Sequence, residues 1–365
     1  MRIALLAPFE ESVPPKKYGG TELVIYNLAE ELVKLGHDVT LLASGDSKTS
    51  ARLVPCVNRA IRVLPLARNQ ATRQALNLAG LANALHVIQS SDYDIVHNHI
   101  GWPALLFFNF MHTPVVTTLH GTLDKTLEPT ENLMLNIHRR HPFISISKSQ
   151  RAHLPTLRFV GTVYNGIDVN RFSFSRNHDG YLAFLGRIHP HKGPAHAIEV
   201  AKKTNHKLII GAKIDPIDEE YFMREVKPLI DGKQIIFLGE LGHKDKVKLL
   251  KNAKALLMPL QWDEPFGIAN IEAMACGTPV ITLNRGSMPE VIANNKTGFI
   301  CENVDEIIEK IDDLPQIDRK TCREHVETHF TSAQMAQKYL KIYTHLINQH
   351  HRRLDREVEL VNELV

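Results

Sequence analysis

The sequence predicts an α/β protein of two doubly wound, Rossmann-like domains, each with a parallel sheet covered by helices on both faces. Short apolar runs typical of buried strands alternate with segments of helical periodicity. This alternation restarts after an Asn-, Gly- and Ser-rich segment at 164–180, and a chain of 365 residues suits two cores. We therefore expect an N-terminal domain over 1–165, a C-terminal domain over 175–330, and a helix over 331–350 that packs back on the N-terminal domain.

The N-terminal domain begins with an expected strand at 2–8, and a helix follows the pair Gly19 and Gly20. This helix starts at Thr21, a suitable N-cap, and stops at Gly36, with apolar residues at helical spacing between them. Further strands are expected at 37–44, 94–99, 113–120 and 142–147.

The C-terminal domain repeats this arrangement of strands and helices. Ligands of open parallel sheets bind at the carboxyl ends of the strands, so we expect the site in a central cleft where the two domains face each other. Strands are expected at 181–186, 206–212, 234–241, 255–260, 278–283 and 298–302.

Composition narrows the classes of function and partner. The formal net charge of +3 does not favour nucleic acid as a partner. The four cysteines have no zinc-like spacing and fit small core positions in a reduced compartment. The longest apolar run, 103–111, is too short to span a bilayer, and the N-terminus lacks the cleavage site of a signal peptide. We therefore expect a cytoplasmic protein.

Two stretches of the N-terminal half contain basic residues but no acidic ones. They are either ordinary solvated helix faces or a surface for an anionic acceptor or for the inner face of an anionic membrane, where each cation adds ~1 kcal/mol. The first stretch contains Lys48, Arg52, Arg59, Arg62, Arg68 and Arg73, and the second contains Arg139, Arg140, Lys148, Arg151 and Arg158.

The stretch WDEPFGIANIEAMACGTPV at 262–280 contains two carboxylates, Glu264 and Glu272, beside a Pro-Phe-Gly turn. Pro265 suits the first turn of a helix. Eight helical residues rise ~12 Å, about the distance between the sugar and the ribose of a nucleotide sugar. In the alternative interpretation, Glu264 caps the helix and Glu272 lies on a solvated face.

The same turn suits a phosphate group. Gly267 allows a ligand to approach the backbone closely, and the amides of Phe266 to Ile268 lie at the start of the helix, where its dipole favours negative charge. The motif therefore predicts a cradle for a nucleotide sugar.

A second loop, GRIHPHKG at 186–193, follows an expected strand and opens the next helix. Its Arg187 and Lys192, together with free helix N–H groups, would form an anion site. Surface cations are common, but this loop and the 262–280 motif both follow strands of one domain and can face one cleft.

The two C-terminal motifs resemble the donor-binding domain of the family 4 retaining glycosyltransferases, which have the two-domain GT-B architecture. The resemblance extends from about residue 1 to 345, and the C-terminal motifs are its specific part. Its weaker parts are VPPKKYGGTE, DIVHNHIGW, TLHG and the interdomain segment YNGIDVNRF.

This resemblance implies roles for individual residues. Arg187 and Lys192 would hold the donor diphosphate, Glu264 would contact hydroxyls of the donor sugar, Glu272 the ribose, and His120 the sugar near its reacting carbon. Fixed cations at the departing diphosphate would be the main electrostatic contribution of a metal-free site. The remaining donor-binding residues would be Gly19, Gly20, Phe266, Gly267 and Ile268, with Gly239 and Leu241 near the base.

Metal sites receive little support from the sequence. His97 and His99 point to one face of an expected strand and His120 ends another, but no carboxylate or fourth ligand has the spacing of a zinc site. Asp92 and Asp94 imitate a DxD motif but precede their strand, away from the expected cleft. We therefore expect no metal and no cofactor.

The predicted function is retaining transfer of a sugar, most commonly UDP-linked in this family, to an unidentified glycan, lipid-linked or small-molecule acceptor. Three alternatives remain: a sugar-nucleotide epimerase of the same architecture, a phosphorylase with phosphate or pyridoxal phosphate, and a non-catalytic sugar-nucleotide-binding protein. A dinucleotide dehydrogenase is disfavoured because the first strand does not lead into GxGxxG.

Overall fold

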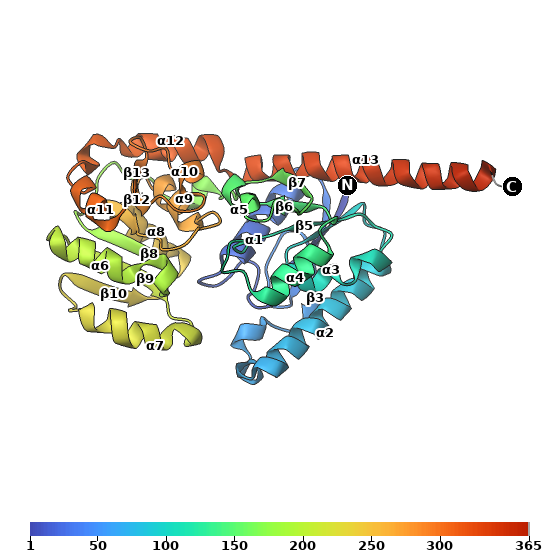
Figure 1. Ribbon diagram of the computed structural model, residues 1–365, viewed down its shortest axis with the longest axis horizontal. Coiled ribbons are helices and arrows are strands. Elements are labelled where there is room, and N and C mark those ends of the chain that lie inside the picture. Colours follow the sequence, from blue (N-terminus) through green and yellow to red (C-terminus); the bar gives the residue numbers. More distant parts are fainter. Residues whose placement is uncertain (364–365) are drawn as a thin grey trace.

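Two parallel sheets organise the chain in the computed structural model, which describes residues 1–363 (Figure 1). The N-terminal sheet has seven strands in the order β3-β2-β1-β4-β5-β6-β7. Strand order reverses between β1 and β4, and ligands of such sheets bind at the carboxyl ends beside this point. The strands are β1 Arg2–Leu6, β2 Asp38–Ser44, β3 Arg52–Val57, β4 Ile95–Asn98, β5 Val115–Thr118, β6 Phe143–Ser145 and β7 Phe159–Thr162.

Helices cover both faces of this sheet because alternate side chains of its central strand are apolar on both sides. Ile3 and Leu5 of β1 belong to the core formed with α1 and the C-terminal helix. Ala4 and Leu6 belong to the opposite core, formed with α2. The helices of this domain are α1 Gly20–Lys34, α2 Gln70–Gln89, α3 Trp102–Leu105, α4 Pro129–Ile137 and α5 Lys148–Ala152.

The C-terminal domain has a six-stranded parallel sheet in the order β10-β9-β8-β11-β12-β13, built around one core. Its strands are β8 Leu182–Arg187, β9 Leu208–Lys213, β10 Ile235–Gly239, β11 Ala255–Met258, β12 Val280–Leu283 and β13 Gly298–Cys301. Its helices are α6 Pro194–Lys203, α7 Glu219–Tyr221, α8 His243–Asn252, α9 Ile268–Ala275, α10 Met288–Val291, α11 Val304–Lys310 and α12 Arg319–His329.

The last helix, α13 (Ser332–Glu363), returns to the N-terminal domain and runs along it, as Figure 1 shows. Its Tyr339 and Tyr343 are fully buried in the core formed with α1. The helix extends beyond residue 350, where we expected it to end. No glycine or proline interrupts the chain from 332 to 363, so nothing in this segment breaks a helix.

The expected strands are all present, but the sequence did not reveal β3 and β7, the two edge strands of the N-terminal sheet. Pro55 lies within β3 and Gly161 within β7, and both residues weaken the signal of a strand. An edge strand tolerates proline because one side of its backbone needs no hydrogen-bond partner. The edge position of β3 therefore explains how Pro55 fits in the sheet.

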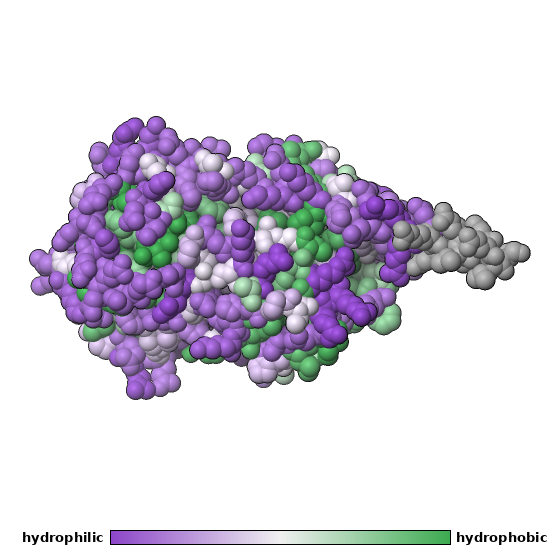
Figure 2. All heavy atoms as spheres, turned by 45° about the horizontal axis from the view of Figure 1, so that its top comes forward, coloured by the Kyte–Doolittle hydropathy of each residue, from purple (hydrophilic) through white to green (hydrophobic). Residues whose placement is uncertain are grey.

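Each domain buries its apolar residues, and hydrophilic side chains cover most of the face seen in Figure 2. As expected, the four cysteines are buried; they form no disulfide. Within residues 1–363, none of the helices combines the length and the apolar character that crossing a membrane requires.

Candidate active site

A cavity of about 600 Å³ lies between the two domains, next to the carboxyl ends of the sheet strands. Residues from both domains line it, so this cavity lies where strand order predicted a site. Gly239 ends β10 and does not line the cavity. The other predicted site residues all line it: Gly19, Gly20, His120, Arg187, Lys192, Leu241, Glu264, Phe266, Gly267, Ile268 and Glu272.

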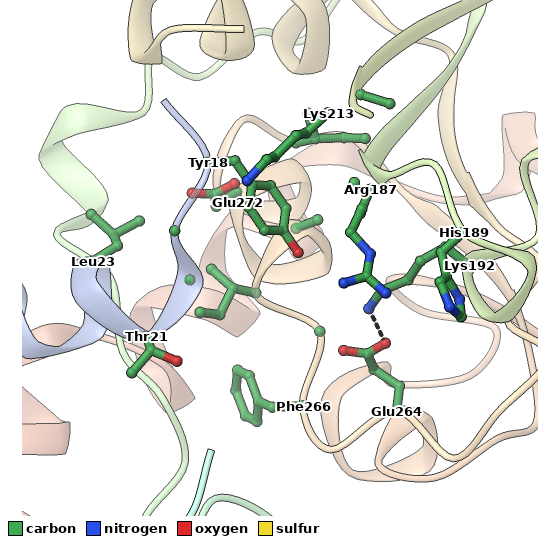
Figure 3. Close-up of a pocket in the computed structure, with 18 of the residues that line it drawn as sticks. Tyr18, Thr21, Leu23, Arg187, His189, Lys192, Lys213, Glu264, Phe266 and Glu272 are labelled. Carbon is green, nitrogen blue, oxygen red and sulfur yellow. Dashed lines mark hydrogen bonds and ion pairs between the residues drawn. The ribbon is translucent and has the colours of Figure 1, made fainter. Parts of the chain in front are cut away.

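Arg187, the last residue of β8, points into the cleft from the C-terminal domain (Figure 3). Its Nε atom lies 3.0 Å from the Oδ2 atom of Asp218, whose side chain is 6% exposed. Burial raises the pKa of Asp218, and the positive charge of Arg187 opposes that shift. Asp218 therefore orients the guanidinium. Sequence reasoning missed this residue because it follows the next strand, in a short turn without a motif.

Lys192 forms an ion pair with Glu264, which Figure 3 marks by a dashed line. Trp262 supports this pair in two ways. Its indole Nε1 donates a hydrogen bond of 2.9 Å to Glu264 Oε2, and its ring centroid lies 5.0 Å from Lys192 Nζ. Glu264 is thus a buried carboxylate that its contacts with Lys192 and Trp262 hold in one orientation. It does not cap α9, since that helix has Gly267 as N-cap and no side-chain cap.

Glu272 lies on α9 and is 3% exposed, so it is not a residue of a solvated face. Its carboxylate pairs with Lys246 of α8, a residue that also lines the cavity. Sequence reasoning overlooked Lys246 because it is one of several lysines in an otherwise ordinary helix. The pair offers a ligand one acceptor and one donor at the same point.

Gly267 adopts the left-handed conformation, with a φ of 77°. A Cβ atom there would lie 2.6 Å from Asn270 Nδ2, so a larger residue meets both backbone strain and a steric clash. The helix begins at Ile268, after this turn, which leaves Pro265 outside the first turn where we expected it. The separation of Glu264 from Glu272 is therefore not all helical rise.

The N-terminal domain contributes the start of α1 to the opposite wall of the cleft, with Thr21 and Leu23 visible in Figure 3. A Cβ atom on Gly19 would lie 2.7 Å from Pro15 Cβ and 2.9 Å from Glu22 Oε2, so only glycine fits there. Glu22 is buried, and this burial raises the pKa of its carboxyl to about 7. Glu22 ends the stretch VPPKKYGGTE, but the sequence analysis predicted no role for it.

His120 follows β5 and lines the cleft from the same domain. Its Nε2 atom lies 2.8 Å from Nδ1 of His99. Burial lowers the pKa of His120 to about 4, so the ring is neutral near pH 7. It can therefore exchange hydrogen bonds with a ligand without adding charge.

The suspected metal motifs have other partners in the structure. Nδ1 of His97 lies 2.6 Å from the Tyr343 hydroxyl. Asp94 accepts a hydrogen bond of 2.7 Å from the Arg2 amide, at the amino ends of the strands and away from the cleft. Over residues 1–363, no group of three or more His, Cys, Asp or Glu residues is arranged to hold a metal ion.

Two Rossmann-like domains that face a central cleft are the GT-B architecture of glycosyltransferases. Comparison with known proteins agrees. The family model described as "Glycosyltransferase Family 4" matches residues 18–171, and the family model described as "Glycosyl transferases group 1" matches residues 167–328. The two matches follow each other along the chain, which therefore belongs to glycosyltransferase family 4.

Individual relatives and solved structures are similar to this chain over most of its length. The glycogen synthase of Mycobacterium tuberculosis is 26% identical over 333 residues, which cover 79% of this chain and 80% of that protein. The phosphatidyl-myo-inositol mannosyltransferase of the same species is 26% identical over 323 residues, with 82% of each chain covered. The structure of Anabaena HepE in complex with UDP and glucose superposes with a TM-score of 0.74 at 18% identity, covering 94% of this chain and 99% of that one.

Proposed function

We propose that this glycosyltransferase is a retaining, metal-independent enzyme that transfers a sugar from a nucleoside-diphosphate sugar to a glycan, lipid-linked or small-molecule acceptor. The observation that carries the proposal is the meeting of Arg187, Lys192, Glu264 and Glu272 in one cleft between the domains. Ion pairs with Asp218 and Glu264 hold Arg187 and Lys192 in place before a ligand arrives.

Arg187 and Lys192 would hold the diphosphate of the donor. Negative charge develops on the diphosphate as the sugar departs, and fixed cations stabilise it without reorganisation at that moment. Two such cations supply the charge that a divalent ion provides in other phosphate sites. Asp218 pairs with Arg187 and Glu264 pairs with Lys192, so each cation is kept in position.

The carboxylates would bind the two sugars of the donor. Glu264 would accept hydrogen bonds from hydroxyls of the transferred sugar, and Glu272 would accept them from the ribose diol. Glu272 is paired with Lys246, and a carboxylate has lone pairs for both partners. His120 would contact the sugar from the N-terminal domain, so donor binding would engage both domains.

UDP is our proposed nucleotide, supported by the similarity to HepE, whose structure is described as a complex with UDP and glucose. The base would lie near the end of β10, where Leu241 lines the cavity and Gly239 precedes it in the chain. Gly19 and Gly20, at the start of α1, would border the diphosphate and the acceptor.

Product analysis tests the transfer and its stereochemistry. The enzyme is incubated with a UDP-sugar and candidate acceptors, with and without EDTA, and the new anomeric proton is followed by NMR. The proposal predicts transfer with the anomeric configuration of the donor, at the same rate in EDTA. Inversion, or loss of activity in EDTA that Mg²⁺ restores, would contradict it. A changed donor sugar without an acceptor would identify an epimerase instead.

We also propose that the N-terminal domain contacts an anionic membrane, which would supply a lipid-linked acceptor. Phe110, Leu133 and Ile137 are exposed by 73%, 57% and 61%. They lie on neighbouring segments, since α3 contacts α4 and the Phe108 ring stacks on the His141 ring. The basic residues Arg139 and Arg140 directly follow α4 and are exposed, which complements an anionic surface.

Flotation with vesicles of phosphatidylglycerol and phosphatidylcholine tests this contact at low salt. The variant Phe110→Ser/Ile137→Ser should lose binding to anionic vesicles. The matched variant Leu66→Ser/Leu78→Ser, which replaces residues of similar exposure, should keep it. The same recovery for all three proteins, or no recovery of the wild type, would refute the membrane contact.

A further inference from the structure

His99 and His120 form a hydrogen-bonded pair in which only one ring reaches the cleft. His99 is 4% exposed, whereas His120 is partly exposed and lines the cavity. The atoms in contact are Nδ1 of His99 and Nε2 of His120, at 2.8 Å. One of the two nitrogens must donate and the other accept, and the direction of this bond decides where the proton of each ring lies.

The second nitrogen of His99 settles the direction. Its Nε2 atom is buried and has no hydrogen-bond partner among the described residues. If His120 donated, neutral His99 would carry its proton on Nε2, as a buried N–H without an acceptor. Orphaned buried N–H groups are rare and cost about 1–3 kcal/mol. If His99 donates from Nδ1, its Nε2 atom is only an unpaired acceptor.

Both rings are neutral, because burial lowers the pKa of His99 well below its usual value and that of His120 to about 4. When His99 donates, the Nε2 atom of His120 is an acceptor and its proton lies on Nδ1. This nitrogen has no hydrogen-bond partner within residues 1–363. It is therefore the atom with which His120 can serve a ligand.

The C-terminal helix supports the pair indirectly, through His97. The ring of His97 lies against that of His99, with centroids 3.9 Å apart. Nδ1 of His97 contacts the Tyr343 hydroxyl at 2.6 Å, and its Nε2 contacts Thr118 Oγ1 at 2.7 Å. Both ring nitrogens of His97 have partners, so His97 cannot accept a hydrogen bond from His99 without breaking one of these two contacts.

We propose that His99 is a positioning residue that fixes His120 as its Nδ1-protonated tautomer, with the N–H available to a hydroxyl oxygen of the substrate in the cleft. The contact with substrate rests on the proposed function, but the tautomer does not. His99 itself touches no ligand. It acts by orienting the ring of His120 and by keeping Nε2 unprotonated.

The tautomer is measured in the free protein by two-dimensional ¹H–¹⁵N NMR of histidine rings near pH 7, with His120→Asn used to assign the signals. The proposal predicts that Nε2 of His120 shows the shift of an unprotonated nitrogen and Nδ1 that of a protonated one. The opposite pattern would overturn it. This result requires no substrate, so it stands or falls separately from the transferase assignment.

Three substitutions separate positioning from packing. The side-chain amide of His99→Asn can donate to His120, and we expect the tautomer and kcat to be retained. His99→Asp can only accept near pH 7, so it should move the proton of His120 to Nε2. His99→Leu should lower kcat about tenfold, the cost of one hydrogen bond, with KM for the donor less changed. Equal kcat in the Asn, Asp and Leu variants would overturn the positioning role.

Discussion

The hydroxyl of Tyr164 donates a hydrogen bond of 2.8 Å to the carboxylate of Glu290. The same carboxylate accepts the backbone N–H groups of Lys148 and Ser149 at 2.8 and 2.7 Å. Glu290 lies on α10 of the C-terminal domain, whereas the other three residues belong to the N-terminal domain and its exit. One side chain thus joins the two domains.

Glu290→Gln should weaken this junction. An amide has one acceptor oxygen where the carboxylate has two, so one backbone N–H would face an NH₂ group. We expect the free energy of unfolding to fall by roughly 2 kcal/mol, the range for hydrogen bonds to a charged group. Urea unfolding measures it, and Tyr164→Phe, which removes a single bond, should cost about half as much. Equal stability of Glu290→Gln and wild type would contradict the junction.

Gly267→Ala should damage both stability and donor binding. The position combines a φ of 77° with a Cβ that would lie 2.6 Å from Asn270 Nδ2. The control is Gly232→Ala, where φ is 71° but no atom lies within 4 Å of the added Cβ. The strain of a left-handed alanine should lower the free energy of unfolding of both variants by ~1–2 kcal/mol. Only Gly267→Ala should also bind nucleotide more weakly in a titration, and equal binding by the two would exclude the steric effect.

Glu22→Gln should change the pH dependence of stability. The pKa of Glu22 is about 7 in the folded state and 4.5 as its ordinary value, so the folded state binds more protons between these pH values. Stability of the wild type is therefore lost as pH rises through this window. The Gln variant lacks this loss and should be more stable at pH 8 by roughly 3 kcal/mol.

Urea unfolding at pH 4 and pH 8 tests this difference. At pH 4 both side chains are neutral in the folded state, so the advantage of Glu22→Gln should largely vanish. The exposed position Glu309 provides the control, since Glu309→Gln should behave alike at both pH values. An advantage of Glu22→Gln that is independent of pH would show that folding does not raise the pKa of this carboxyl.

Asp218→Asn should weaken the binding of nucleoside diphosphates without removing a cation. Asparagine keeps the shape of the side chain but loses the charge that orients Arg187 from 3.0 Å. We expect Kd to rise about tenfold, or ~1.4 kcal/mol, in calorimetric titration. Glu220→Gln is the control, because its ion pair with Arg224 is exposed and lies in the same segment. An unchanged Kd for nucleoside diphosphates in Asp218→Asn would mean that Arg187 binds them without the charge of Asp218.

Much of the fold and of the cleft could be predicted from periodicity and motifs. The strands with continuous apolar runs were recognised, whereas β3 and β7 were concealed by Pro55 and Gly161 at the edges of the sheet. Arg187, Lys192, Glu264 and Glu272 stood out because Gly- and Pro-containing loops after strands bring such residues to one cleft. Local patterns were sufficient for these residues.

The partners of these residues could not be predicted, because tertiary contacts bring them together. Lys246 reaches Glu272 from another helix, and Asp218 reaches Arg187 from the turn after the next strand. His97 looked like a metal ligand in the sequence, but Tyr343 from the distant C-terminal helix occupies its ring nitrogen. No spacing in the chain encodes a contact between elements so far apart.

Calorimetric titration measures whether Arg187 and Lys192 bind the diphosphate of a donor. UDP, GDP and ADP are added to wild type, to Arg187→Ala and to the control Arg224→Ala, an exposed arginine of the same domain. We expect a nucleoside diphosphate, most strongly UDP, to bind the wild type and the control equally in EDTA, and to bind Arg187→Ala at least about tenfold more weakly. If the wild type binds no nucleoside diphosphate, or if all three proteins bind it equally, Arg187 does not hold the diphosphate.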